Sequence, residues 1–280
     1  MDIQNNLITL ADGNQMPQEG FGLYKVRGQA AVDTAVKAAY ENGYRLFDTA
    51  QLYENEQEVG NAFKKFAIPR ENIFVTTKVT EARQGYDEAI ASVKESLQKL
   101  QMDYVDLLLI HWPVRQHFFE TWRAFEDLKK AGLTKSIGVS NYQTIHLEYL
   151  ATKANEMPVV DQVEMHPFLT LRPVIEFNKQ HNIVTQAWSP LGRGTVLDQE
   201  VLKEIADKYQ KSPAQVVLRW HLQNGVAFIP KSVHEERIAQ NADIYDFELS
   251  DEEMKQVDKL NKFARTGREP ELTYEYGRMY

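Results

Sequence analysis

The sequence contains no cysteine. Disulfide bonds, thiolate nucleophiles and cysteine-based zinc sites are therefore excluded, we predict no metal site, and the chain fits a reducing compartment. No apolar run is long enough to span a membrane, and the N-terminus, MDIQNNLITLADGNQ, has neither the basic region nor the apolar stretch of a signal peptide. We therefore expect a cytoplasmic protein that makes no contact with membranes.

Positive charge is also scarce, because 32 Lys and Arg face 40 Asp and Glu and give a formal net charge of −8. This balance argues against binding to nucleic acid, although a local pocket for a phosphate is still compatible with it. No Gly/Ser linker, low-complexity run or short repeat interrupts the 280 residues. We expect a single domain over 1–280 and, without an obvious exposed apolar patch or coiled coil, a monomer.

Short β-rich apolar runs alternate along the chain with segments of helical periodicity. The runs are Phe21–Tyr24, Arg45–Phe47, Ile73–Thr77, Val105–Ile110, Thr134–Val139, Val159–Val163, Ile183–Ala187 and Val226–Ile229. The helical segments are Ala31–Glu41, Glu56–Phe66, Asp87–Leu100, Phe119–Lys130, Ile145–Ala151, Arg172–Gln180, Pro213–Gln223 and Glu235–Asn241. Such alternation favours parallel strands, and eight repeats predict a (β/α)8 TIM barrel in the α/β class, with an open doubly wound sheet as the alternative.

Turn and cap signals refine this prediction. Asp12-Gly13 lies between apolar residues and predicts an N-terminal β-hairpin that covers the bottom of the barrel. Helix starts are indicated by Asn55 with Glu58, by Ser212 with Pro213 and Gln215, and by Ser232 with Glu235. Leu249–Leu260 predicts an extra C-terminal helix.

Polar residues follow nearly every predicted strand, at the end where barrels of this class carry their chemistry. They are Asp48, Lys78, His111, Ser140, Asn141, Gln162, Glu164, Trp188, Ser189, Lys231 and Ser232. Any one of them is also explained as a solvated loop residue or a helix cap. Their shared position is what predicts an active site.

Three of these positions, and Tyr53 nearby, have competing explanations. Lys78 ends an apolar strand, where burial is costly without a carboxylate, and Asp48 on the next strand is the natural partner, although Asp48 alone is explained as a helix cap. His111, in LLLIHWP, is either catalytic or a satisfied core residue. Tyr53, five residues after Asp48, is either catalytic or packs against the barrel rim.

Longer motifs run through almost the whole chain in one order. They are GYRLFDTAQLYENEQEVG (43–60), TTKV around Lys78, LIHWP around His111, GVSNY ending at Tyr142, QVEMHP from Gln162, AWSPLG from Ala187, and IPKS followed by Arg237 and Asn241. On these motifs the chain resembles the aldo-keto reductases, and within them the bacterial 2,5-diketo-D-gluconate, glyoxal and methylglyoxal reductases. The resemblance implies an NADPH-dependent oxidoreductase whose catalytic tetrad is Asp48, Tyr53, Lys78 and His111.

The resemblance also implies a mechanism in which Tyr53 donates a proton to a carbonyl oxygen while hydride reaches the carbonyl carbon. A free tyrosine has a pKa of about 10, so we expect Lys78 to lower the pKa of Tyr53 by stabilising its phenolate, with Asp48 holding the ammonium in place. His111 is expected to hydrogen-bond the carbonyl oxygen and orient the substrate.

Cofactor contacts follow by the same resemblance, and no GxGxxG fingerprint is present. Ser140, Asn141 and Gln162 are expected to bind the carboxamide and Trp188 to stack on the nicotinamide. The segment from Ser189 through Leu191 to Gly194 is expected to cover the pyrophosphate. Lys231, Ser232, Val233 and Arg237 are expected to hold the 2′-phosphate at a helix N-terminus, with Gln240 and Asn241 facing adenine. Two cations there favour NADPH over NADH.

The substrate pocket departs from the usual pattern. Many aldo-keto reductases have a tryptophan soon after the catalytic lysine, whereas this chain reads Lys78-Val79-Thr80-Glu81-Ala82-Arg83. We therefore expect one aromatic wall to be missing and charge to be introduced. Tyr24, His111, Trp112 and the tail 274–280 are the expected pocket residues, and a small carbonyl compound is the expected partner.

Two other functions are compatible with parts of the sequence. A Schiff-base lyase with Lys78 as the nucleophile shares the fold, but it does not explain Tyr53 and His111. A non-catalytic NADPH-binding module that senses redox state shares the cofactor site, but it does not require the complete tetrad.

Overall fold

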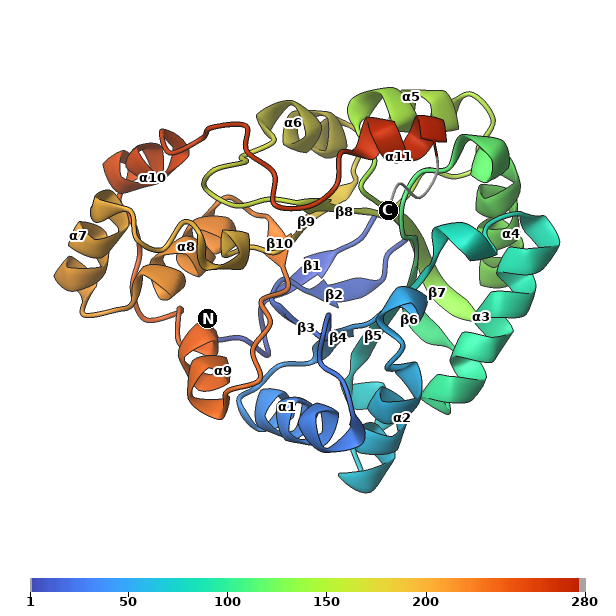
Figure 1. The fold of residues 1–280 in the computed structure, drawn as a ribbon, viewed down its shortest axis with the longest axis horizontal. Helices are drawn as coiled ribbons and strands as arrows, with labels where there is room; N and C mark the ends of the chain where they lie inside the picture. Colours follow the sequence, from blue (N-terminus) through green and yellow to red (C-terminus); the bar gives the residue numbers. More distant parts are fainter. Residues whose placement is uncertain (1, 277–280) are drawn as a thin grey trace.

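The computed structural model describes residues 2–276, and its centre is a sheet of eight strands (Figure 1). The strands are β3 (Gly20–Gly22), β4 (Leu46–Asp48), β5 (Phe74–Val79), β6 (Val105–Ile110), β7 (Thr134–Ser140), β8 (Val160–Glu164), β9 (Val184–Trp188) and β10 (Ala227–Phe228). Each overlaps one of the predicted runs. They are almost entirely buried, which explains why the sequence shows continuous apolar runs and no alternation.

The eight strands close into a barrel. Consecutive strands pair in parallel from β3 to β10. A parallel bridge between Glu19 and Phe228 then brings β10 back beside β3, and the backbone N–H of Gly22 donates to the Pro230 carbonyl at 3.0 Å. The predicted (β/α)8 barrel is confirmed, and the alternative of an open doubly wound sheet is wrong.

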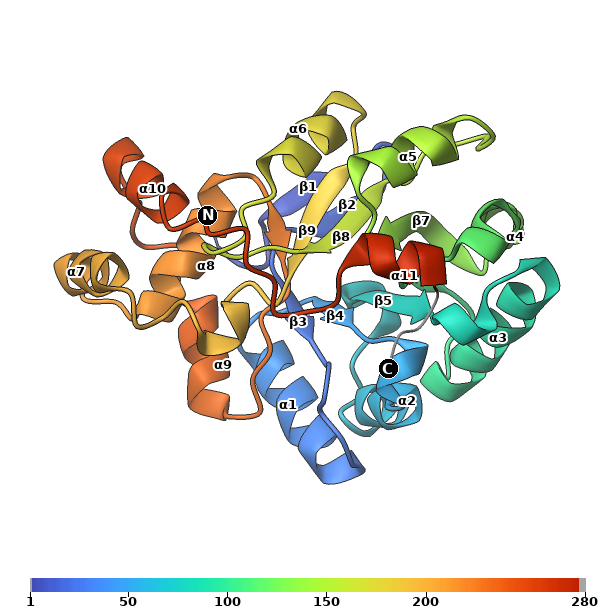
Figure 2. The same cartoon turned by 45° about the horizontal axis from the view of Figure 1, so that its top comes forward.

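Helices surround the sheet (Figures 1 and 2). They are α1 (Gln29–Glu41), α2 (Glu56–Lys65), α3 (Tyr86–Leu100), α4 (Phe118–Lys130), α5 (Thr144–Ala151), α6 (Arg172–Gln180), α7 (Glu200–Tyr209), α8 (Pro213–Gln223), α9 (Glu235–Ala242), α10 (Asp251–Asp258) and α11 (Pro270–Tyr276). All predicted helices are present. Two helices, α7 and α11, were not predicted. α7 was missed because one helix was expected between two strands, whereas α7 and α8 both precede β10.

The predicted N-terminal hairpin is also present. It pairs β1 (Leu7–Thr9) antiparallel with β2 (Gln15–Pro17), and Gly13 in the turn has a φ of 86°, which favours glycine. Leu10 and Met16 are buried in a cluster that includes Leu107 and Val160 of the barrel. The hairpin therefore closes the bottom of the barrel and leaves the other end for ligands.

Two of the three helix-start predictions fall at the correct residue. Ser212 caps α8 with a reciprocal pair of bonds to Gln215. Asn55 precedes α2 as predicted, but it does not cap the helix: its amide accepts from the Thr49 hydroxyl at 2.6 Å and donates to two loop carbonyls. Asn55 thus holds the loop that follows β4, the strand that carries Asp48.

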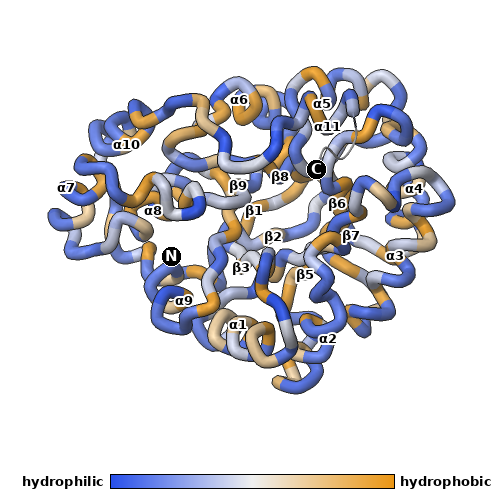
Figure 3. Tube along the Cα trace, viewed as in Figure 1, coloured by the Kyte–Doolittle hydropathy of each residue, from blue (hydrophilic) through white to orange (hydrophobic). Residues whose placement is uncertain are grey.

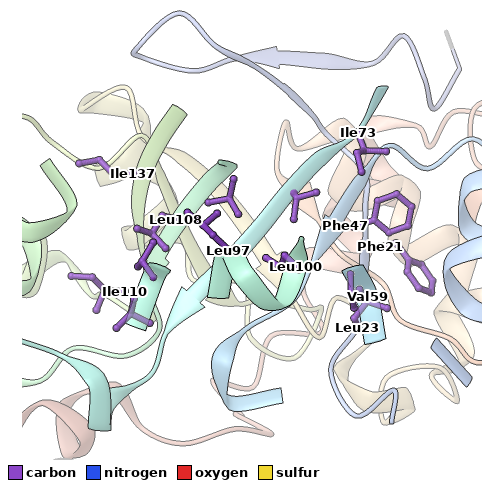
Figure 4. Packing of buried hydrophobic residues seen from close by; sticks show 14 of the residues in the cluster. Phe21, Leu23, Phe47, Val59, Ile73, Leu97, Leu100, Leu108, Ile110 and Ile137 are labelled. Carbon is purple, nitrogen blue, oxygen red and sulfur yellow. The ribbon is translucent and has the colours of Figure 1, made fainter. Parts of the chain in front are cut away.

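The main hydrophobic core lies between the strands and the helices packed on them. Figure 4 shows Phe47, Leu108 and Ile137 of the barrel wall packed with Leu97 and Leu100 of α3. Along the surrounding helices hydrophobic and hydrophilic residues alternate, as expected for helices with one buried face (Figure 3). This packing makes the barrel a rigid support for the residues at its mouth.

Candidate active site

A cavity of about 1170 Å³ opens at the mouth of the barrel, where the strands have their C-terminal ends. The predicted site residues that line it are Tyr24, Asp48, Tyr53, His111, Trp112, Ser140, Asn141, Gln162, Trp188, Ser189, Leu191, Lys231, Ser232, Arg237, Gln240 and Asn241. Three predicted residues are not in the lining: Lys78 and Glu164 are fully buried, and Val233 is 40 % exposed. The structure therefore brings together residues from all around the barrel.

Lys78 and Asp48 form a buried ion pair in the floor of this cavity. Lys78 Nζ donates to Asp48 Oδ1 at 2.5 Å and to the Thr49 carbonyl at 3.0 Å, and it lies 3.2 Å from the Tyr53 hydroxyl. The second oxygen of Asp48 accepts from Gln162 Nε2 at 2.7 Å. Every bonding direction of the ammonium is used, which compensates the cost of burying it.

Burial shifts the pKa of each member of this pair, and the charge of its partner opposes the shift. Burial lowers the pKa of Lys78, and the charge of Asp48 opposes that shift. Burial likewise raises the pKa of Asp48, and the charge of Lys78 opposes it. Because Lys78 is fully buried and its amine is tied to three oxygens, it is not presented to a substrate carbonyl, which argues against the Schiff-base lyase.

Tyr53 ends a short 3-10 turn, η1 (Gln51–Tyr53), and lies between two aromatic rings, with centroid distances of 5.0 Å to Tyr24 and 5.7 Å to His111. Burial raises the pKa of Tyr53 well above its ordinary value, and the negative charge of Asp48 adds to the shift. Lys78 is not among the causes of this shift, so the expected lowering of the pKa of Tyr53 by Lys78 stays a prediction. Tyr53 is a protonated phenol at neutral pH, the state that an acid requires.

His111 directly follows β6 and completes the group. Its backbone N–H donates to the Val79 carbonyl at 3.0 Å, and its own carbonyl accepts from Asn141 Nδ2 at 2.9 Å. Burial lowers the pKa of His111 well below its ordinary value, and the positive charges of Lys78 and Arg268 add to this. The imidazole is therefore neutral at pH 7 and offers one N–H donor.

Next to these groups lie the residues expected to bind a carboxamide. Asn141 has a φ of 65°, and its amide oxygen accepts from Trp188 Nε1 at 2.9 Å. Ser140 Oγ donates to the Gln162 carbonyl at 2.7 Å. Both protons of the Gln162 amide are used by Asp48 and Gln186, so only its oxygen is free to accept from a ligand. The three side chains are close together, and their role remains a prediction.

Cations gather at the part of the lining that follows β10. Lys231 and Arg237 were predicted there, and Lys25 and Arg193 join them without any signal in the sequence. Burial lowers the pKa of Lys231, and the charge of Lys25 adds to the shift. An ammonium group whose charge is disfavoured by burial and by a neighbouring cation indicates a site that fits an anion.

The predicted cap residue Ser232 does not directly precede the helix at this site. The residue that precedes α9 is His234, without a side-chain cap, whereas Ser232 lies two residues further back and its Oγ accepts from the His234 N–H at 3.1 Å. A serine two residues before a helix makes a local turn of its own. Ser232 lines the cavity, but the exposed Val233 does not.

A segment between α10 and α11 crosses the mouth of the barrel (Figure 1). Its role at the mouth was not predicted from the sequence. Glu164, at the end of β8, accepts from the backbone N–H groups of Thr266 and Gly267 and from the Thr266 hydroxyl. A Cβ on Gly267 would lie 2.4 Å from the Trp188 ring, so only glycine fits there. We call residues 261–268 the strap.

The C-terminal tail does not line the cavity as expected. Tyr274 packs against Phe118 and His146, outside the lining, and residues 277–280 lie outside the described residues. The strap residues Thr266, Gly267 and Arg268 line the cavity in its place.

The charge that the segment after Lys78 was expected to introduce lies beside the cavity and not in its lining. Glu81 is buried and its carboxylate pairs with Arg268 at 2.6 Å.

No group of three or more His, Asp or Glu residues that could hold a metal ion occurs within residues 2–276. Over the same range, no helix has the length and apolar character needed to cross a bilayer.

Comparisons with known proteins agree with this geometry. The model of the "Aldo/keto reductase family" matches residues 20–262. The chain is 49 % identical over 264 residues to "Glyoxal reductase" of Bacillus subtilis (strain 168), covering 94 % of this chain and 96 % of the relative. It is 44 % identical over 269 residues to "Methylglyoxal reductase DkgA" of Escherichia coli O157:H7, covering 95 % and 97 %.

A solved structure shows the same fold with a cofactor bound. The crystal structure of a Gox0644 mutant in complex with NADPH has a TM-score of 0.90 and 42 % identity, covering 95 % of this chain and 97 % of that one. Family and fold thus agree with the residues gathered at the mouth of the barrel. The chain belongs to the aldo/keto reductase family and is an NADPH-dependent oxidoreductase.

Proposed function

We propose that this reductase converts small dicarbonyl compounds or keto-sugar acids to alcohols, with Tyr53 as the proton donor. One observation carries the proposal: a protonated Tyr53 hydroxyl lies 3.2 Å from the ammonium of Lys78 and beside the neutral ring of His111, in the lining of an open cavity. The names of the relatives, glyoxal reductase and methylglyoxal reductase, support the substrate class.

In the proposed mechanism, bound NADPH supplies the hydride. The Tyr53 hydroxyl donates its proton to the carbonyl oxygen as negative charge develops there. Lys78 stabilises the phenolate that remains, and Asp48 keeps the lysine charged and oriented. His111, being neutral, donates a hydrogen bond to the same oxygen and positions the substrate.

The cofactor contacts are proposed on the lining residues. Those proposed to touch it are Ser140, Asn141 and Gln162 at the carboxamide, Trp188 at the nicotinamide, Ser189, Leu191 and Gly194 at the pyrophosphate, Lys231, Ser232, Val233 and Arg237 at the 2′-phosphate, and Gln240 and Asn241 at adenine. The cations after β10 support this orientation, since the 2′-phosphate distinguishes NADPH from NADH. Val233 has the weakest support, because it is not in the lining.

We also propose that residues 1–280 act as one domain, as a cytoplasmic monomer without a nucleic-acid partner. The hairpin buries Leu10 and Met16 in the barrel, and the strap bonds to Glu164, so both ends of the described chain are integrated into the barrel. The net negative charge supports the absence of a nucleic-acid partner.

The experiment is a comparison of wild type with Tyr53→Phe, following loss of NADPH absorbance with methylglyoxal, phenylglyoxal and a diketo-sugar acid. We expect wild type to reduce at least one of them and Tyr53→Phe to lose about 10²- to 10⁴-fold in kcat with unchanged NADPH affinity. If wild type binds NADPH tightly and reduces none of them, the redox-sensing module replaces the reductase. If Tyr53→Phe keeps its activity, the proton donor is another residue.

A further inference from the structure

We propose that Arg268 on the strap, held by Glu81 and Trp112, forms a subsite for the carboxylate or another anionic group of the carbonyl substrate. The inference rests on the proposed function, because it concerns which carbonyl compounds the same site prefers. It makes Arg268 a residue that determines specificity.

The position of Arg268 separates it from the cations proposed to bind the cofactor. Its side chain contacts Glu81, which follows β5, and Trp112, which follows β6. Lys231 and Arg237 follow β10, and in the closed strand order β10 and β6 lie on opposite sides of the barrel. The cavity therefore has a cationic group on each side. Arg268 packs on Trp112, the residue that follows His111 in the chain.

Arg268 is held in place before any ligand arrives. One nitrogen of its guanidinium donates to Glu81 at 2.6 Å, and the group lies 4.3 Å from the centroid of the Trp112 ring. The adjacent Gly267 is fixed by Glu164 and wedged against Trp188. A planar guanidinium stacked on an aromatic ring keeps its other N–H groups directed in the plane, where a carboxylate can accept from them.

The charges in the lining favour an anion. Among the described residues, the cavity is lined by Lys25, Arg193, Lys231, Arg237 and Arg268, and Asp48 is the single carboxylate in it. Asp48 is already paired with Lys78. One Glu81 oxygen accepts from one nitrogen of Arg268, so N–H groups of the other guanidinium nitrogens remain for a substrate anion, and Glu81 is not part of the lining. Because Lys231 and Arg237 are assigned to the cofactor, Arg268 is the cation that meets a substrate anion on its side of the cavity.

The test uses two aldehydes that differ in one charge, 4-carboxybenzaldehyde and benzaldehyde, with NADPH as the reductant. We expect Arg268→Met to lower kcat/KM for 4-carboxybenzaldehyde by about 10- to 100-fold, the loss typical of a hydrogen bond to a charged group. For benzaldehyde we expect a change below about threefold, because no charged contact is lost. Arg268→Lys should keep part of the preference, since the charge remains and the planar fork is lost.

Two further variants separate a local contact from a general effect of charge. Lys262→Met removes a cation from the exposed start of the same strap and should leave the ratio between the two aldehydes unchanged. Glu81→Gln removes the internal counter-ion of Arg268 and should raise kcat/KM for the carboxylate by about twofold to fivefold. A fall for both aldehydes in Arg268→Met, or an equal shift in Lys262→Met, would overturn the subsite.

A binding measurement keeps this test independent of turnover. The protein loaded with NADP⁺ cannot reduce the aldehydes, so calorimetry reports their affinities directly. We expect 4-carboxybenzaldehyde to bind more tightly than benzaldehyde to wild type and equally to Arg268→Met. If this difference is found but neither these aldehydes nor methylglyoxal, phenylglyoxal or the diketo-sugar acid is reduced, the proposed function fails and the anion subsite stands. If the carbonyl compounds are reduced and no difference is found, the subsite fails and the function stands.

Discussion

The floor and the rim of the cavity use charge in opposite ways. In the floor, Lys78 and Asp48 are buried and bonded to each other, so the group is complete without a ligand. At the rim, Lys231 after β10 and Lys25 after β3 line the cavity, and burial together with the charge of Lys25 lowers the pKa of Lys231. The difference teaches that the floor is organised by folding, whereas the rim is organised for an anionic ligand, and each should respond differently to substitution.

The largest effect is expected in the floor. Lys78→Met should lower kcat by at least about 100-fold, because the phenolate of Tyr53 loses its cation, and should lower the free energy of unfolding by about 3–5 kcal/mol, because Asp48 is left as an unpaired buried charge. The measurements are steady-state kinetics and urea unfolding. The double variant Lys78→Met with Asp48→Asn should regain stability but no activity. Recovery of both together would mean that the pair is structural only.

A smaller effect, confined to binding, is expected at the rim. Lys231→Met should weaken NADPH about 10- to 100-fold, leave NADH within about threefold, and keep kcat and the free energy of unfolding nearly unchanged. Fluorescence titration with both cofactors measures this, and added salt should weaken NADPH more than NADH. An equal loss for NADPH and NADH would place Lys231 at a part of the cofactor that both share, and the contrast between rim and floor would then lose its basis.

The smallest effect on the cavity concerns Glu19, a buried carboxyl outside the lining and without a cation, whose substitution acts on stability. Burial raises the pKa of Glu19 from 4.5 to about 8, and the Tyr245 hydroxyl that donates to it at 3.1 Å offsets this only in part. The folded state thus keeps its proton where the unfolded state loses it, so stability falls as pH rises from about 4.5 to about 8. Glu19→Gln should remove a slope of about 1 kcal/mol per pH unit, measured by urea unfolding at several pH values. An unchanged slope would show that Glu19 ionises freely in the fold.

The sequence predicts the barrel well because its information is local and repeated. Each buried strand is a short apolar run, each helix has a periodic face, and the residue after each strand falls at the mouth by topology alone. Asp48, Lys78 and His111 could be placed together for this reason. Lys231 and Arg237 could be placed together in the same way.

What the sequence could not predict depends on distance and burial. The pKa of Tyr53 depends on how deeply its hydroxyl lies and on its distance from the charge of Asp48, neither of which a motif contains. The pair of Glu81 and Arg268 joins residues 187 positions apart through a strap without regular structure. Ser232 resembles a helix cap in sequence, but the helix begins only after His234.

The hairpin at the bottom of the barrel also limits the routes by which ligands can enter and leave. Because Leu10 and Met16 close that end of the barrel, ligands reach the described cavity from the mouth, which the strap crosses. A compound lying deep beside Tyr53 must depart along the route by which it arrived. Changes to the strap should therefore be felt in the rate at which product escapes, even where the chemistry in the floor is untouched.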